Sequence, residues 1–208
     1  MANIRGQLAG LKPPYVLMPY SCAGIYCEYY AAQYPNEIEA LVLLDTSPTV
    51  ESFVENLLLG EKELESLSVQ PSKFVLGLNG ILGPLLLLLM GEKQEHIQAG
   101  YTKDEILEMS TTPNHMGTLV VQMRALPDNL REVVALERKL ELPVFLLSCG
   151  EMKEDTKYQK HLKGHLEKLG AHAKHMFIDG STHSDIYWRR AYREIICREV
   201  DDFLNALR

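Results

Sequence analysis

Apolar and polar positions form blocks along the chain, and these blocks predict strands separated by helices. Short, largely apolar runs at residues 15–20, 38–46 and 142–150 have the length and composition of buried strands, and residues 173–180 predict a last strand. Between the first two runs, residues 22–34 place small and aromatic side chains at helical spacing. Strand, helix and strand in this order predict a βαβ unit, whose strands pair in parallel.

The last part of the chain continues the alternation with two surface helices. Residues 157–170 read as a helix that Gly170 closes. The tail repeats apolar side chains at spacings of four, four, three and four residues, which predicts one apolar helical face made of Tyr192, Ile196, Val200, Phe203 and Leu207.

The middle of the chain lacks this alternation and predicts helices only. Pro113 stands where a first helical residue is expected, and Pro127 marks the start of a second helix. We therefore expect the chain to divide into a core of residues 1–49 and 140–208 and a helical insertion of residues 50–139.

One segment of this insertion, residues 74–91, is almost wholly apolar. It approaches the roughly 20 residues that a membrane-spanning helix needs. Internal Gly residues, a Pro and an Asn break it into short pieces, which favours a buried helix pair or the lining of a substrate pocket. Contact with a membrane is the alternative.

Composition narrows the classes of function. The 208 residues, 46% of them hydrophobic, are enough for a substantial core, and a net charge of -7 argues against nucleic acid as a partner. The seven His and four Cys show neither metal-ligand nor C-x-x-C spacing, so we expect no metal, no cofactor and reduced thiols in the cytoplasm. The N-terminus lacks a signal-peptide pattern.

Ser21 and His183 each follow a predicted strand, and Asp45 lies at the end of one. The carboxyl ends of parallel strands share one edge of a sheet, where ligands bind. An imidazole can activate a Ser hydroxyl, and a carboxylate orients the imidazole. The N–H of Cys22, at the start of the next helix, could hold an oxyanion. Ser21 and Asp45 could instead cap local structure, and His183 could be a solvated loop residue.

Two segments resemble a known family. "PPYVLMPYSCAGIYCEYYAAQYPNEIEALVLLDTSP", residues 13–48, resembles the nucleophile-elbow region of the α/β-hydrolase family, and "IDGSTHSDIY", residues 178–187, resembles its His loop. The resemblance spans nearly the whole chain and implies a mostly parallel sheet with a helical cap. It implies a serine hydrolase acting on a carboxylic ester or a related small-molecule acyl substrate, with Ser21 as nucleophile and His183 as base.

The resemblance leaves the acid open between two strand ends. Members of the family carry it either near Asp155, beside Glu151 and Glu154, or at Asp45. The loop "GEMKED" is not a clean match, so we favour Asp45.

The chain departs from the family pattern in two ways. The motif G-x-S-x-G reads Pro19-Tyr20-Ser21-Cys22-Ala23, and Pro19 has no N–H. Only the last four strands of a sheet of roughly eight are found, and the early loop with the second oxyanion donor is missing. We expect an N-terminally truncated sheet with an exposed edge, which a partner or a second copy of the chain would cover. An inactive protein that binds a small apolar ligand or a partner chain is the alternative function.

Overall fold

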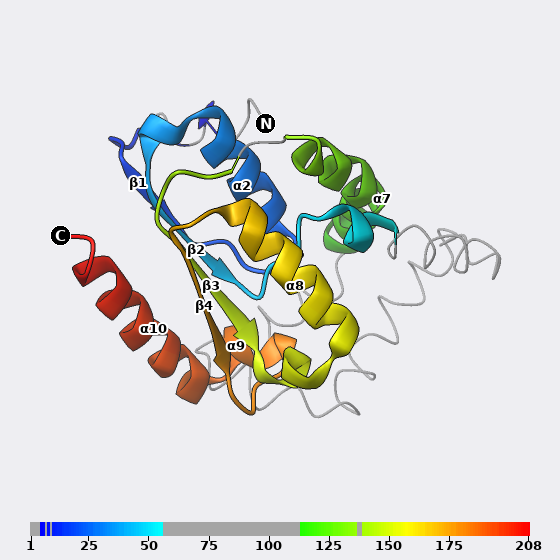
Figure 1. Cartoon of the computed structure of the whole chain (residues 1–208). Helices are drawn as coiled ribbons and strands as arrows, with labels where there is room; N and C mark the ends of the chain where they lie inside the picture. Colours follow the sequence, from blue (N-terminus) through cyan, green and yellow to red (C-terminus); the bar gives the residue numbers. More distant parts are fainter. Residues whose placement is uncertain (1–4, 7, 9, 56–112, 137–138) are drawn as a thin grey trace.

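The computed structural model describes residues 5, 6, 8, 10–55, 113–136 and 139–208 (Figure 1). In this part of the chain, four strands form one parallel sheet whose spatial order follows the sequence: β1 (Tyr15–Leu17), β2 (Ile38–Leu44), β3 (Val144–Cys149) and β4 (Ala173–Ile178). The predicted strands and their parallel pairing are confirmed.

Helices surround this sheet. They are α2 (Ala23–Gln33), α7 (Pro113–Val134), α8 (Thr156–Leu169), α9 (His183–Trp188) and α10 (Arg190–Asn205), with short 3-10 helices η1 (Pro35–Glu37) and η2 (Gly150–Glu154). Residues 51–55 are also helical.

Two apolar clusters fill the layers on either side of the sheet. On one face, α2 and α8 pack on alternate side chains of β2 and β3, such as Leu41 and Leu146. On the other face, α9 and α10 pack on the intervening side chains, such as Val42 and Phe145 (Figure 1). Successive side chains of a strand point to opposite faces, so strands that are apolar throughout are buried on both sides.

The structure corrects one helix boundary. Pro127 was expected to start a helix, but it lies inside α7, which runs from Pro113 to Val134. A Pro within a helix removes one backbone hydrogen bond. Leu126 and Leu130, on either side of it, are both buried against Ile25. The helical turns before and after Pro127 are thus both buried in the same apolar cluster, and this burial offsets the lost hydrogen bond.

Several expectations fall partly or wholly outside the described residues. Residues 56–112 include the apolar segment 74–91 and most of the expected insertion 50–139, so the division into core and cap stays a prediction. Within the described ranges, none of the helices combines the length and the apolar character that crossing a membrane requires.

Candidate active site

Ser21 lies on a sharp turn between β1 and α2. Its φ is 57°, in the left-handed region that L residues rarely adopt. The main chain of Leu44 holds the turn, because its N–H donates to the carbonyl of Pro19 (2.9 Å) and its carbonyl accepts from the N–H of Ser21 (3.1 Å). Pro19 therefore takes part as an acceptor, and its lack of an N–H does not prevent the turn.

Small residues let α2 approach the segment that follows β2. A Cβ on Gly24 would lie 2.5 Å from the Cβ of Thr46, so a larger residue does not fit there. This close approach brings the end of β2 beside the turn at Ser21.

His183 is the first residue of α9, and a capping box holds it there. The Thr182 hydroxyl accepts from the N–H of Asp185 (3.3 Å), and the Asp185 carboxylate accepts from the N–H of Thr182 (2.9 Å). This reciprocal pair satisfies two N–H groups at the helix start. The sequence carries its signal, a Thr followed three residues later by an acid, although our sequence analysis did not use it.

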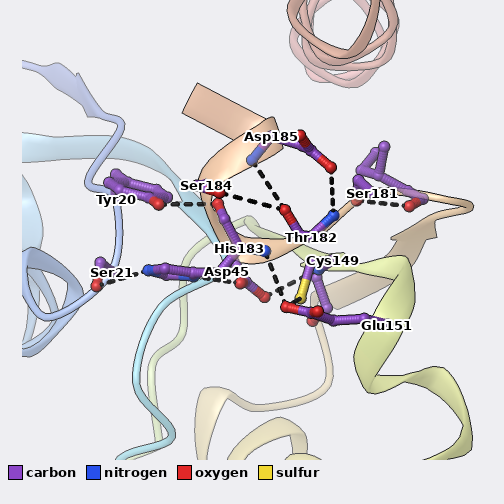
Figure 2. A network of polar contacts seen from close by, with 12 residues as sticks. Tyr20, Ser21, Asp45, Cys149, Glu151, Ser181, Thr182, His183, Ser184 and Asp185 are labelled. Atoms are coloured by element: carbon purple, nitrogen blue, oxygen red, sulfur yellow. Dashed lines mark hydrogen bonds and ion pairs between the residues drawn. The ribbon is translucent and has the colours of Figure 1, made fainter. Parts of the chain in front are cut away.

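The structure brings Ser21, His183 and Asp45 together in one line of hydrogen bonds (Figure 2). The distance from Ser21 Oγ to His183 Nε2 is 3.1 Å, and that from His183 Nδ1 to Asp45 Oδ2 is 2.5 Å. The other oxygen of Asp45 accepts from the N–H of Cys149 (2.9 Å). The Asp45 side chain is 6% exposed and that of His183 is 44% exposed, so the carboxylate is buried and the imidazole is partly open to solvent.

This arrangement suits a general base. A carboxylate at Nδ1 favours the tautomer with its proton on that nitrogen, which leaves Nε2 free to accept the Ser21 proton. Asp45 has a φ of 44°, and it follows β2, the strand beside β1.

The other acids considered from the sequence occupy different places. Asp155 is exposed and caps α8, where it accepts from the N–H groups of Lys157 (2.8 Å) and Tyr158 (3.0 Å). The bond from Tyr158 is the main cause that lowers the pKa of Asp155. Glu154 is exposed, and Glu151 accepts from the main chain of His183 and not from its ring.

The N–H of Cys22 has no hydrogen-bond acceptor among the described residues. Within residues 10–55, the neighbouring N–H groups of Ala23 and Gly24 donate to the carbonyls of Tyr20 and Ser21 at 3.1 Å, whereas no acceptor is found for that of Cys22. A free N–H beside the hydroxyl of Ser21 is the kind of donor that holds a developing oxyanion.

Solved structures share this arrangement of strands and helices. Cfl2 from Burkholderia cenocepacia superposes with a TM-score of 0.68 at 17% identity, over 97% of this chain and 69% of that one. An α/β hydrolase enzyme, MGS-M2, from a deep-sea metagenome library of the Medee basin gives 0.58 at 15% identity, over 98% and 70%. The chain has the α/β-hydrolase fold. An epoxide hydrolase from Bacillus megaterium also matches, with a TM-score of 0.66 at 16% identity over 98% and 74%.

Comparisons of the sequence with known proteins match only a short part of the chain. No family model matches the chain. A stretch of 37 residues is 51% identical to the uncharacterized protein YbdG of Bacillus subtilis (strain 168). This stretch makes up 18% of this chain and 11% of that protein. The predicted lack of the first strands of the α/β-hydrolase sheet stays a prediction.

Two contacts of this candidate site have no signal in the sequence. The Tyr20 side chain reaches the main chain of His183, and the N–H of Cys149 reaches Asp45. Both join residues more than 100 positions apart. Among the described residues, no group of three His, Cys, Asp or Glu is placed to hold a metal ion.

Proposed function

We propose that the chain is a serine hydrolase that cleaves a carboxylic ester or a related acyl compound. The observation that supports this most directly is the pair of hydrogen bonds from Ser21 Oγ through the His183 ring to Asp45. In addition, Ser21 has the positive φ of a sharp strand-to-helix turn, the geometry that presents a nucleophile at the sheet edge.

The proposed reaction has two steps. Ser21 Oγ attacks the carbonyl carbon while its proton passes to His183 Nε2, and the N–H of Cys22 binds the oxyanion. The imidazolium, stabilised by Asp45, then gives its proton to the departing alkoxide, which leaves an acyl-Ser21 ester. A water molecule attacks this ester with His183 again as base, and the acid and free Ser21 are released.

The residue at the turn restricts the chemistry. A similar solved structure is that of an epoxide hydrolase. Here the turn carries a hydroxyl and no carboxylate, so we propose acyl transfer and not the opening of an epoxide by an Asp nucleophile.

A fluorophosphonate probe tests the nucleophile. We expect the wild-type protein to be labelled covalently at Ser21, as shown by mass spectrometry of the modified peptide, and Ser21→Ala to remain unlabelled. Circular dichroism of both proteins checks that they are equally folded. Absence of labelling in folded wild-type protein would contradict the proposal.

The choice of acid is tested by Asp45→Asn against Asp155→Asn. An amide at residue 45 no longer favours the required tautomer and cannot balance an imidazolium, so we expect the labelling rate to fall by about 10³- to 10⁴-fold. Asn also caps helices well, so Asp155→Asn should keep the wild-type rate. A larger loss for Asp155→Asn than for Asp45→Asn would reverse the assignment.

The alternative is a protein of this fold that binds a small apolar ligand or a partner chain without turnover. It is favoured by the coverage of the comparisons, since the chain matches only 69% and 70% of the lengths of Cfl2 and MGS-M2. Folded protein that binds a fluorescent fatty acid saturably but resists the fluorophosphonate would support this alternative.

A further inference from the structure

The main chain of His183 is held on both sides by side chains from other strand ends. The hydroxyl of Tyr20, after β1, donates to the carbonyl of His183 at 2.8 Å. The carboxylate of Glu151, after β3, accepts from the N–H of His183 at 3.0 Å (Figure 2). Both backbone polar groups of His183 are therefore fixed by distant residues. Tyr20 lies 163 positions away in the sequence, and Glu151 lies 32 positions away.

Tyr20 also contacts the imidazole itself. The rings of Tyr20 and His183 are stacked, with centroids 4.7 Å apart and planes inclined by 19°. Stacking limits rotation of the imidazole, because the ring would have to leave the face of Tyr20 to turn. Tyr20 immediately precedes Ser21, so one short segment carries both the hydroxyl that faces Nε2 and the ring that covers the imidazole.

The environment keeps the Tyr20 hydroxyl protonated. Burial raises its pKa first, and the negative charge of Asp45 raises it further. A neutral phenol keeps the proton that it donates to His183. On the other side, Glu151 also lies near the thiol of Cys149, whose Sγ is 3.7 Å from Glu151 Oε1.

We propose that Tyr20 and Glu151 are positioning residues, which hold the His183 main chain so that its ring stays between Ser21 and Asp45. This inference rests on the proposed function for its effect on rate. The side chain of His183 is 44% exposed, so packing around the ring constrains it less than it would a buried side chain. Misplacing a catalytic group by about 1 Å can cost about 10²-fold in rate, and we expect the loss of one of the two contacts to cost about tenfold.

The first test compares Tyr20→Phe with Tyr192→Phe. Each variant loses one phenol-to-carbonyl hydrogen bond in the same loop, since Tyr192 donates to the carbonyl of Gly180 at 2.7 Å. Only Tyr20 touches His183. We expect Tyr20→Phe to lower the fluorophosphonate labelling rate about tenfold, while Tyr192→Phe keeps the wild-type rate. Both should lose similar amounts in melting temperature, so that a general loosening of the loop would not explain the difference.

Glu151 is tested by Glu151→Ala against Glu151→Gln. The Gln side chain keeps an oxygen that accepts the N–H of His183, so it should retain most of the labelling rate. Ala removes the acceptor, and we expect a loss of about tenfold. Equal losses in the two variants would mean that the charge of Glu151 matters and the hydrogen bond does not, which would overturn this half of the inference.

A second measurement separates this inference from the proposed function. Nitrogen NMR of the His183 imidazole reports its tautomer and hydrogen bonding without any substrate. We expect Tyr20→Phe and Glu151→Ala to shift the His183 tautomer signals, and Tyr192→Phe to leave them unchanged. If wild-type protein is not labelled but these shifts occur, the hydrolase proposal fails and the positioning stands. Wild-type NMR signals in both variants, with labelling rates within twofold of that of Tyr192→Phe, would overturn the positioning.

Discussion

At the scale of single residues, the candidate site carries backbone strain at two positions. Ser21 and Asp45 have φ values of 57° and 44°, in a region that costs a residue with a Cβ roughly 1–2 kcal/mol. Asp tolerates this region better than most residues because its short polar side chain can bond locally. Ser21 is held there by the main-chain bonds to Leu44. Such strain persists where the surrounding structure over-determines a conformation, as at many functional sites.

The strain at Ser21 predicts an unusual order of stabilities. We expect the free energy of unfolding in urea to be about 1 kcal/mol higher for Ser21→Gly than for Ser21→Ala, because Gly adopts a positive φ freely. Ser184, inside α9, is the control, and there Gly should be less stable than Ala by about 1 kcal/mol. If Ser21→Ala is the more stable of its pair, the turn is not strained in solution.

At the scale of elements, a buried polar cluster joins the helix behind Ser21 to its neighbours. Glu28 on α2 is 3% exposed and His165 on α8 is 0% exposed, and the distance from Glu28 Oε1 to His165 Nε2 is 2.9 Å. The second oxygen of Glu28 accepts from the hydroxyl of Thr49 at 2.6 Å. The cluster therefore ties α2 to α8 and to the segment that follows Asp45.

Removing one partner of this cluster should cost stability. Breaking a buried pair leaves the other group without its partner, at a cost of about 3–5 kcal/mol. We expect Glu28→Ala to lower the free energy of unfolding in urea by about 3 kcal/mol, and Glu28→Gln to lose less because its amide oxygen still accepts from Thr49. Glu167→Ala, at an exposed position of the same helix as His165, should stay within about 0.5 kcal/mol of wild type. A loss for Glu28→Ala no larger than this control would mean that the cluster contributes no net stability.

At the scale of the whole molecule, the buried His161 and the half-buried His175 are expected to make the stability of the protein depend on pH. Burial is the main cause that lowers the pKa values of His161 and His175. An unfolded chain titrates its histidines near about pH 6.5, so between this value and the lower folded pKa it binds more protons than the native protein. Stability therefore rises with pH through this window. The stability that the two neutral histidines contribute is complete above about pH 6.5 and is lost as the pH falls below that value.

Urea unfolding between about pH 5 and pH 8 measures this dependence. We expect His175→Gln to reduce the slope of unfolding free energy against pH below about 6.5, because one of the two groups is gone. His172→Gln, at an exposed position, is the matched control for the loss of one imidazole. A slope that is unchanged in His175→Gln would exclude His175 as a source of the pH dependence.

The edge of the sheet bears on association. Among the described residues, β1 pairs only with β2, and Val16 and Met18 are 38% and 56% exposed. An apolar edge strand favours pairing with another chain. The association of two copies through this edge stays a prediction. Light scattering should show a mass that rises with concentration, and Met18→Lys should suppress the rise.

Leu207, another exposed apolar residue near the C-terminus, provides the control for this experiment. Leu207→Lys adds the same charge away from β1 and should associate as wild type does. A constant monomer mass for wild type at all concentrations would remove the predicted association, and equal suppression by the two variants would assign it to net charge.

The sequence by itself determined the succession of strands and helices and the strand ends that carry Ser21, Asp45 and His183. These features depend on neighbours in the chain, through the periodicity of apolar residues and the turn chemistry of small ones. Only the tertiary structure decided which acid meets the imidazole, since Asp45 and Asp155 both follow strands of one sheet. It also decided that Tyr20 and Glu151 hold the main chain of His183 and that α7 continues through Pro127. Those outcomes depend on contacts between segments far apart in the chain, which local patterns do not encode.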